Sequence, residues 1–403
     1  MIRTRAGLVA GCLSVALFGC GVEAGGASSE AAELERPPVS QAASQSEALR
    51  IEVNQNSIAY DYFPSTHVPH GIAGDEQFVF VTQPLSGRVS VNNRLTGEEI
   101  ATLPAPAIGW LLPFTLRVTS SGHLTVLDAG GFPNPFFPSV ARLYEYDYSW
   151  NRRTRAFEAT LVRTISFEGL PVVFAEDFEP LPGGGYVLSE SVIGALWNVS
   201  AGGVITPGLL PDSFAPGAGI PALGPCGFTP TTIDGIPFST AGNFAPGVGS
   251  LAYRNGNLYF GSTCRGGIAR IPVASLTDMT RSPQQRAADI VDVSPRAANV
   301  ATESLKGLTF NRWKPSDTRL YVTDTMKRRI LRIDTTTGAR EVVADDPVLF
   351  DFPVSAQFLP PVAGISPLVV ASDQEYRLAA LNALITEDML HPPFIGSKLY
   401  GTH

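Results

Sequence analysis

The chain has 403 residues and a formal net charge of −8. It contains no run of Lys and Arg, and because the phosphates of nucleic acids require basic surfaces, the sequence excludes nucleic acid as a partner. Its 39 glycines and 33 prolines are spread through the body of the chain instead of gathering in one linker. This distribution favours many short strands joined by turns, and so an all-β fold.

Residues 1–19 have the organisation of a signal peptide. Arg3 and Arg5 precede an apolar stretch at 6–18, which is shorter than the roughly 20 residues that a membrane-spanning helix needs. The stretch ends in LFGC at 17–20, which resembles a bacterial lipobox and implies cleavage before Cys20 and attachment of a lipid to its thiol. The alternative is an ordinary signal peptide followed by a chance cysteine.

Residues 20–50 are predicted to be a flexible tether that carries the lipid on Cys20. They are rich in Ala, Ser, Glu, Gln and Gly, and such a segment buries too little apolar surface to offset its ordering entropy. Gly21 directly after the cysteine implies sorting to the outer membrane in the lipoproteins that the lipobox resembles. We therefore expect an extracytoplasmic protein, held to a membrane by its lipid alone, with its folded domain at 51–403.

The four cysteines divide between processing and folding. Cys12 leaves with the signal peptide and Cys20 takes the lipid, so Cys226 and Cys264 remain. Two cysteines in an oxidising compartment predict one disulfide, with a pair of free thiols as the alternative.

The folded region repeats one pattern six times, beginning near residues 71, 115, 177, 250, 307 and 355. Each copy has a short apolar strand, a turn, a second strand that ends in a polar residue, and a third strand; the clearest copy spans 307–344. Repeats of this length predict a six-bladed β-propeller with four-stranded blades, in which residues near 50–62 complete the last sheet. A long insertion, roughly 210–248, is expected on the face of the channel mouth. The alternative to the propeller fold is a pair of β-sandwiches.

The fifth copy carries a family resemblance. Its strands RLYVTDT at 319–325 and RILRID at 329–334 resemble the six-bladed propellers of the senescence marker protein, gluconolactonase and strictosidine synthase-like superfamily. The resemblance implies one divalent cation such as calcium, held at the channel mouth by a Glu, an Asn and an Asp, and hydrolysis of a lactone. Glu176 matches the Glu, but Gly249 and Lys306 stand where the Asn and the Asp are expected, so the metal-ligand set is incomplete.

The residues that begin each innermost strand line the channel mouth of a propeller. The candidates at this register are His70, Phe114, Glu176, Gly249, Lys306 and Val354. His70, Glu176 and Lys306 fall on alternate blades and are expected to converge, so that they can act as acid and base without a metal because each shifts the pKa of the others. The alternative is a structural salt bridge that plugs the channel.

Two further groups are candidates for substrate binding. Polar residues end the second strands, and of these Asp128 and Glu190 are predicted to face substrate because they flank the blade of Glu176. Aromatic residues gather in the loops of the same face and predict an apolar pocket; they include Trp110, Phe114, Phe136, Phe174 and Phe244. The alternative is that these aromatic side chains pack the insertion onto the propeller.

The sequence thus predicts a monomeric, lipid-anchored propeller that hydrolyses a lactone or an ester of a small apolar molecule. Glu176 would act as metal ligand or base, His70 as acid or base, and Lys306 would stabilise the oxyanion. Two alternatives remain open: a non-catalytic scaffold that binds a ligand or a protein, and a condensing or cyclising enzyme similar to strictosidine synthase, which uses one Glu and no metal.

Overall fold

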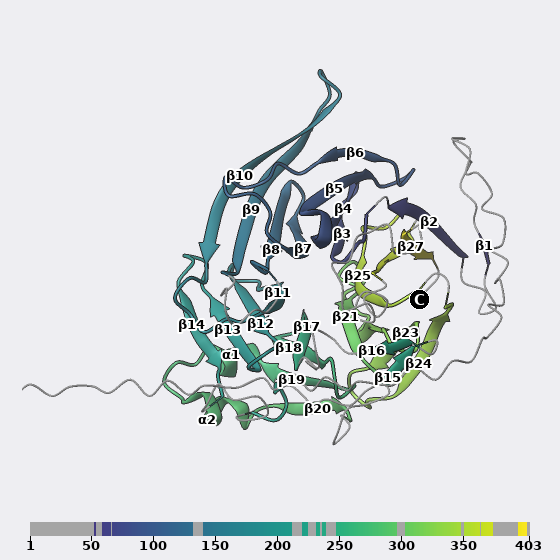
Figure 1. Cartoon of the computed structure of the whole chain (residues 1–403). Helices are drawn as coiled ribbons and strands as arrows, with labels where there is room; N and C mark the ends of the chain where they lie inside the picture. The colour runs from purple at the N-terminus through teal and green to yellow at the C-terminus, as the bar shows by residue number, and fades with distance from the viewer. Residues whose placement is uncertain are drawn as a thin grey trace, which may run out of the picture. The chain divides into compact units, whose positions relative to one another are not determined.

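The computed structural model describes most of the folded region (Figure 1). It describes residues 67–131, 140–211, 220–224, 247–295, 303–347, 350–362 and 364–373, together with the strand backbone at 52–53, 59–65, 231–233, 236–238 and 394–400. The predicted signal peptide and tether, Cys20, Phe136, Cys226 and Phe244 lie outside the described residues, as does most of the 210–248 insertion. No helix among the described residues is long and apolar enough to cross a membrane.

Five four-stranded antiparallel sheets follow one another along the chain, and the first strand of each sheet lies nearest the common centre (Figure 1). The first two sheets contain β3 (Ile72–Gly74), β4 (Phe78–Gln83), β5 (Arg88–Asn93) and β6 (Glu99–Thr102), then β7 (Pro113–Ser120), β8 (His123–Asp128), β9 (Arg142–Asn151) and β10 (Ala156–Ser166). The third contains β11 (Ala175–Pro180), β12 (Tyr186–Glu190), β13 (Ala195–Val199) and β14 (Ile205–Leu209).

The fourth and fifth sheets have the same strand order. They contain β17 (Val248–Arg254), β18 (Asn257–Ser262), β19 (Ile268–Pro272) and β20 (Val291–Ser294), then β21 (Leu305–Phe310), β22 (Arg319–Asp324), β23 (Arg329–Asp334) and β24 (Arg340–Asp345). Smaller elements lie between the sheets: the 3-10 helix η1 (Pro84–Ser86), the hairpin β15 (Thr231–Ile233) with β16 (Ile236–Phe238), and the helices α1 (Val273–Leu276) and α2 (Pro283–Ala287).

A further sheet has five strands, in the order β1–β2–β27–β26–β25. β25 (Pro353–Phe358), β26 (Leu368–Ser372) and β27 (Phe394–Tyr400) come from the end of the chain, and β2 (Ala59–Ser65) and β1 (Glu52–Val53) from its beginning. β2 pairs with β27 along its full length, in agreement with the expected joining of residues near 50–62 to the last sheet. The third strand expected at 377–381 lies outside the described residues; the strand that pairs with β26 is β27, which corrects that assignment.

The innermost strands contact one another in a closed cycle. β3 contacts β7, then β11, β17, β21 and β25 follow in turn, and β25 returns to β3. Each pair of neighbouring sheets encloses one cluster of buried apolar side chains, which accounts for six of the seven clusters among the described residues. A pair of sandwiches would not produce such a cycle, so the prediction of an all-β propeller with four-stranded antiparallel blades is confirmed.

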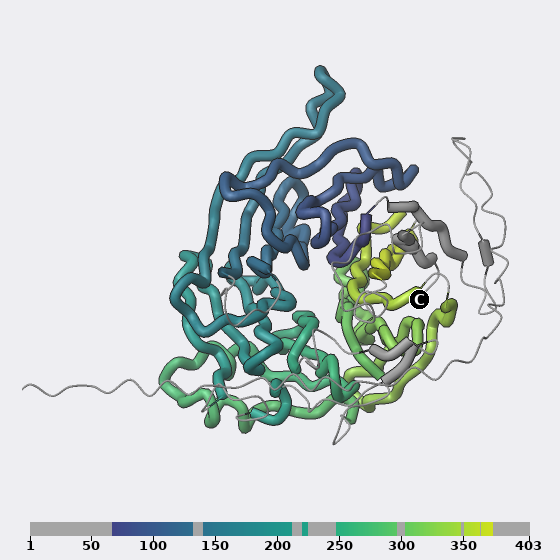
Figure 2. Tube along the Cα trace, in the orientation of Figure 1, coloured from purple at the N-terminus to yellow at the C-terminus, as the bar shows by residue number. Residues whose placement is uncertain are grey.

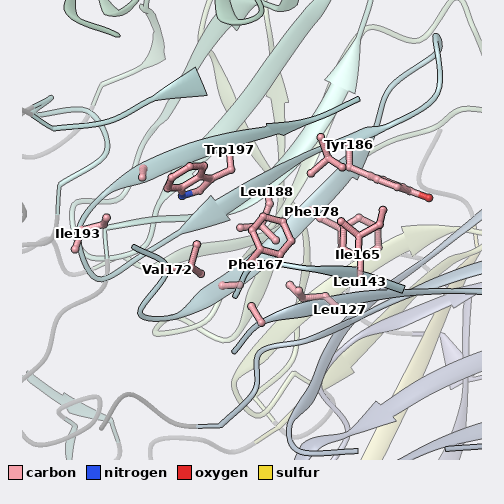
Figure 3. Close-up of a cluster of buried hydrophobic side chains, with 14 residues drawn as sticks. Leu127, Leu143, Ile165, Phe167, Val172, Phe178, Tyr186, Leu188, Ile193 and Trp197 are labelled. Atoms are coloured by element: carbon pink, nitrogen blue, oxygen red, sulfur yellow. The ribbon is translucent and has the colours of Figure 1, made fainter. Parts of the chain in front are cut away.

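The cluster between the second and third sheets shows how one blade packs onto the next (Figure 3). Leu127 and Leu143 from the second sheet face Phe178, Leu188 and other side chains of the third, and all four are fully buried. Such packing of large side chains removes both sheet faces from water. β8 pairs only with residues 142–147 of β9, so the rest of β9 and its partner β10 extend beyond the sheet as a hairpin (Figure 2).

A register shift recurs near the beginning of the innermost strands. The pairing shifts between Pro113 and Thr115 in β7, and between Ala175 and Asp177 in β11. β25 shifts between Pro353 and Ser355, and β17 and β21 shift at the same level, at 248–251 and 306–309. A bulge leaves its extra residue out of the ladder and re-aims that side chain. Of the candidate residues of the predicted ring, Phe114, Glu176, Gly249 and Val354 lie at these bulges and Lys306 directly precedes one, whereas His70 precedes β3, which has no register shift.

The cluster in Figure 3 generates a stability prediction. Phe178→Ala should lower the free energy of unfolding by about 3–5 kcal/mol, because the ring is fully buried between two blades and its loss leaves a cavity. Leu95→Ala is the control: that side chain is 64% exposed, so its loss should change the free energy by less than about 0.5 kcal/mol. Urea unfolding measures both, and equal effects would contradict the assigned packing.

Candidate functional site

Glu176 and Lys306 form a buried ion pair across the inner surface of the ring. Glu176 Oε1 lies 3.4 Å from Lys306 Nζ, and each side chain is only 6% exposed. Glu176 is the bulge residue of β11, and Lys306 directly precedes the bulge of β21, so the third and fifth blades hold the two ends of the pair. Removing two charges from water is costly, and a fixed partner is what makes each charge tolerable there.

Gly249 makes room for this ion pair. A Cβ atom at position 249 would lie 2.5 Å from Thr263 Oγ1 and 3.0 Å from Glu176 Oε1. Any larger residue would therefore push against the Glu176 carboxylate. The family resemblance implies an Asn at position 249. The chain has Gly there instead, because the Glu176 carboxylate occupies the space that an Asn side chain would need.

His70 is held in one tautomer by the backbone. Its Nδ1 lies 3.0 Å from the carbonyl oxygen of Phe114, and because a carbonyl only accepts, Nδ1 carries the proton. Its Nε2 is therefore the unprotonated nitrogen; it is buried and has no hydrogen-bond partner among the described residues. The nearest carboxylate oxygen, Asp373 Oδ2, lies 3.8 Å away, beyond hydrogen-bond distance.

The surroundings of His70 keep its imidazole neutral. Burial, reinforced by the positive charge of Lys306, lowers the pKa of His70 from 6.5 to about 3, against the opposing effect of the hydrogen bond to Phe114. His70 is therefore uncharged at neutral pH, with a lone pair on Nε2. The interaction with Lys306 also places the imidazole in the electrostatic field of the ion pair.

His70, Glu176 and Lys306 line one small cavity inside the ring, together with Val354 and other residues of the inner strands. Its volume is about 10 Å³, which is about the space that one water molecule needs. The three residues expected to converge are thus neighbours of one cavity. Their chemical roles stay predictions.

The aromatic candidates separate into two environments. Phe114 stacks on His70 with ring centroids 3.6 Å apart, and Phe174 contacts Phe114 edge to face at 5.1 Å. Together with Leu112 and Ala129 they form a buried apolar cluster beside the imidazole. Trp110 packs instead on Tyr144 and Tyr146, in the core between the first two blades. Trp110 is therefore not part of this cluster, and its predicted contact with substrate stays a prediction.

Asp128 and Glu190 hold the loops that carry this aromatic cluster. Asp128 accepts hydrogen bonds from the backbone of 111, 112 and 130, and Glu190 from the backbone of 174, 192 and 193. Burial raises the pKa of Glu190 to about 7. These bonds give both carboxylates a positioning function, since they fix the segments that lead to Phe114 and Phe174. Their predicted contact with substrate is untested.

The residues at the mouth do not fit the calcium ion that the family resemblance implies. Calcium prefers six to eight oxygen ligands. Here the ammonium of Lys306 stands beside the only carboxylate of the predicted set, and Gly249 supplies no side-chain oxygen. No group of three or more His, Cys, Asp or Glu side chains among the described residues is arranged to hold a metal.

Asp373 belongs to the same set of polar residues after the second strands as Asp128 and Glu190, but the sequence did not predict its place beside His70. It follows the second strand of the last sheet, where its carboxylate lies near His70 because the first and last sheets are neighbours. Ring closure is the signal that predicts this contact, since it brings the beginning and end of the repeats together. Cys264 is buried near the same face, and its predicted pairing with Cys226 stays a prediction.

Several solved propellers are similar to this chain in fold. A protein of unknown function from Bacteroides thetaiotaomicron matches with a TM-score of 0.51 and 12% identity over 84% of this chain and 72% of that chain. A gluconolactonase from Xanthomonas campestris matches with a TM-score of 0.50 and 11% identity over 87% and 92%. A virginiamycin B lyase from Staphylococcus aureus matches with a TM-score of 0.44 and 12% identity over 85% and 99%.

These likenesses show the fold alone, and the class of protein that they define is a β-propeller. One such fold carries many activities, and at these identities the activity does not follow from it. No protein-family model matches the chain, and no curated protein matches it.

The neutral state of His70 predicts a measurable pH effect. Its pKa is about 3 when folded and about 6.5 when unfolded, so between these values the unfolded state binds more protons and acid destabilises the fold. At pH 4 this loss is about 3 kcal/mol. His70→Asn keeps a donor toward Phe114 but cannot take the charge, so its stability deficit relative to the unmodified protein should shrink from pH 7 to pH 4. Urea unfolding at both pH values measures this, and a constant deficit would contradict the buried, neutral imidazole.

Proposed function

We propose that the protein is a metal-independent hydrolase that opens a lactone or an ester of a small apolar molecule at the channel mouth. The observation that carries the proposal is the buried Glu176–Lys306 pair, with the unprotonated Nε2 of His70 facing the same small cavity. A carboxylate, an ammonium and a neutral imidazole supply a proton acceptor and an oxyanion partner in one water-poor place.

The reaction follows from these three groups. A water in the small cavity attacks the carbonyl carbon of the substrate and passes a proton to His70 Nε2 or to the Glu176 carboxylate. The carbonyl oxygen becomes an oxyanion beside Lys306 Nζ, which stabilises it. The carbonyl then re-forms as the bond to the alkoxide breaks, and the alkoxide takes up the proton, so that a lactone leaves as one hydroxy acid and an ester as an acid and an alcohol. Asp373, near His70, stabilises the transient imidazolium.

The apolar cluster beside His70 supports the substrate class. Phe114 stacks directly on the imidazole, and Phe174 contacts Phe114. An apolar group seated against these rings would place its carbonyl next to the cavity. Asp128 and Glu190 support the rings through the backbone bonds of the adjoining loops.

A second candidate function is a non-catalytic scaffold that binds a ligand or a protein. The size of the central cavity, about 10 Å³, favours it, because a closed ion pair also serves to plug a channel. In this case Glu176 and Lys306 stabilise the ring without contacting a substrate.

We infer that the five-stranded sheet is the sixth blade of the propeller. Its inner strand β25 closes the cycle between β21 and β3, and the clusters on both of its faces match those between the other blades. The pairing of β2 with β27 ties the start of the domain to its end, so the blade also locks the ring.

We further propose that the propeller is a monomeric, extracytoplasmic lipoprotein of the outer membrane, anchored through Cys20, with a Cys226–Cys264 disulfide. The tether of about 30 residues would keep the domain within tens of ångströms of the bilayer, by the scaling of roughly 5–6 Å times the square root of chain length. Apolar substrates concentrate at that surface.

Removing the ion pair separates catalysis from stability. Glu176→Gln leaves a buried, unpaired ammonium and should cost about 3–5 kcal/mol of unfolding free energy, and Lys306→Met should cost a similar amount. The double variant removes both charges and should recover most of that loss. All three variants should lack turnover of an apolar lactone such as γ-nonalactone and of 4-nitrophenyl butyrate.

Glu99→Gln is the matched control, because it breaks an ion pair with Arg88 that is partly exposed. It should cost less than about 1 kcal/mol and leave turnover unchanged. A stable double variant that still hydrolyses either compound would sink the hydrolase assignment. An unmodified protein that hydrolyses neither, but whose double variant is fully stable, would favour the scaffold.

The lipid anchor is tested independently of activity. Cys20→Ser should abolish lipid attachment and move the protein from the membrane fraction to the soluble extracytoplasmic fraction. Cys12→Ser is the control and should leave both unchanged, since that residue leaves with the signal peptide. Intact mass and detergent partitioning measure the outcome; an unmodified mature protein without lipid mass would refute the anchor.

A further inference from the structure

A second cavity lies at the opposite ends of the inner strands. Its volume is about 270 Å³, and its lining comes from the later residues of β7, β11, β17, β21 and β25. Lys306 and Phe310 mark the two levels on β21; four residues of strand at about 3.3 Å each separate them by about 13 Å. Arg117 lines both cavities, so it stands between the two levels.

Arg312 reaches across this end of the ring. It follows β21 of the fifth blade, yet its Nη1 donates to the carbonyl oxygen of Val118 in β7 of the second blade, at 2.9 Å. Its guanidinium also lies over the ring of Trp313, 4.8 Å from the centroid. A guanidinium has five N–H donors, and the bond to Val118 is the only one that Arg312 makes among the described residues.

The two buried guanidiniums of this region differ in how their charge is balanced. Arg117 donates to both oxygens of Asp177 and to Glu179, and these carboxylates raise the pKa of Arg117 despite its burial. Burial lowers the pKa of Arg312, and the more distant charges of Glu179 and Glu76 do not offset it. Arg117 thus has its anions within the protein, whereas Arg312 would gain from a further one.

Two other polar atoms of the lining are buried without a hydrogen-bond partner among the described residues. They are Nε of Arg254, a donor, and Oε1 of Gln357, an acceptor. Nη2 of Arg254 is already used, because it donates to carbonyl oxygens of the loop at 314–317. A ligand that satisfies this lining must therefore supply acceptors to the guanidiniums and a donor to Gln357.

We propose that this cavity binds a small carboxylate that also carries hydroxyl groups, with Arg312 as the residue that recognises the carboxylate. The planar guanidinium matches the two oxygens of a carboxylate, and a hydroxyl donates to Gln357 Oε1. Three guanidiniums and the single carboxylate of Glu179 line the cavity, which favours an anion over a neutral polyol. The site is separate from the channel mouth of the proposed hydrolase and does not depend on it.

Glyceric acid tests the proposal, because glycerate and glycerol have the same carbon skeleton and differ in the carboxylate. Isothermal titration of the full chain in detergent, at low salt, should give saturable binding of glycerate and none of glycerol. Arg312→Gln can still donate to Val118 but lacks the charge, and it should weaken binding about tenfold or more. Arg153→Gln, on the exposed turn of the β9–β10 hairpin, is the matched control and should change nothing.

Binding should also strengthen between about pH 8 and pH 6. Burial raises the pKa of Glu179 to about 7; the positive charge of Arg117 opposes this rise, and the negative charge of Asp177 adds to it. Glu179 also accepts a hydrogen bond from the backbone of Tyr253 in the fourth blade and interacts with the charge of Arg312 in the fifth. Protonation of Glu179 over this range removes the one negative charge of the lining. A bound anion should therefore gain affinity several-fold as the pH falls.

Hydrogen exchange on the unmodified protein keeps the proposal testable if Arg312→Gln fails to fold. Glycerate should slow exchange of the backbone amides at 311–317 more than elsewhere in the propeller, and glycerol should not. Equal binding of glycerate and glycerol, unchanged affinity in Arg312→Gln, or no saturable binding and no local protection would each overturn the proposal and leave a water-filled cavity.

Discussion

The buried ion pair of Glu176 and Lys306 constrains everything around it. Two charges withdrawn from water cost several kcal/mol each unless their geometry is fixed, and the fixed geometry comes from the bulges of β11 and β21. The pair requires a glycine at 249, because a side chain there would meet the carboxylate. Burial is the larger cause of the lowered pKa of His70, and the ammonium of the pair reinforces it. The pair thus constrains the sterics of the site and contributes to its electrostatics.

The sequence predicted the strands well where the apolar run was continuous. The second strands of the blades, such as Phe78–Gln83 and Arg319–Asp324, are almost wholly buried, and the latter agrees to within one residue with the strand expected at 319–325. The register of the mouth residues followed from the same repeats. The contact of His70 with Asp373 did not, because it joins residues that are 303 positions apart (373 − 70) and depends on closure of the ring. The position of Trp110 also escaped prediction, since its loop folds back onto Tyr144 and Tyr146.

The incomplete metal-ligand set takes on a physical meaning in the structure. From the sequence, Gly249 and Lys306 are two missing ligands in an otherwise family-like ring. In the fold they belong together: Lys306 supplies the positive charge beside Glu176, and Gly249 leaves the space in which the carboxylate meets it. A fixed ammonium can stabilise an oxyanion as a cation does, but it brings no open coordination position for a substrate oxygen. The hydrolysis proposed for this mouth accordingly rests on general acid–base chemistry.

Charges along the channel are arranged in levels that influence one another. Lys306 faces Glu176 near the mouth, Arg117 faces Asp177 and Glu179 below it, and Arg312 lies at the far end. Neighbouring levels are separated by a few residues of strand, a distance about equal to the Debye length in saline. Salt screens these charges less than it screens exposed ones, because protein and not water fills the interval. Protonating Glu179 would strengthen the positive field that Arg117 presents to both cavities. A ligand that neutralises Arg312, as proposed above, would act in the opposite direction at the level of Glu179.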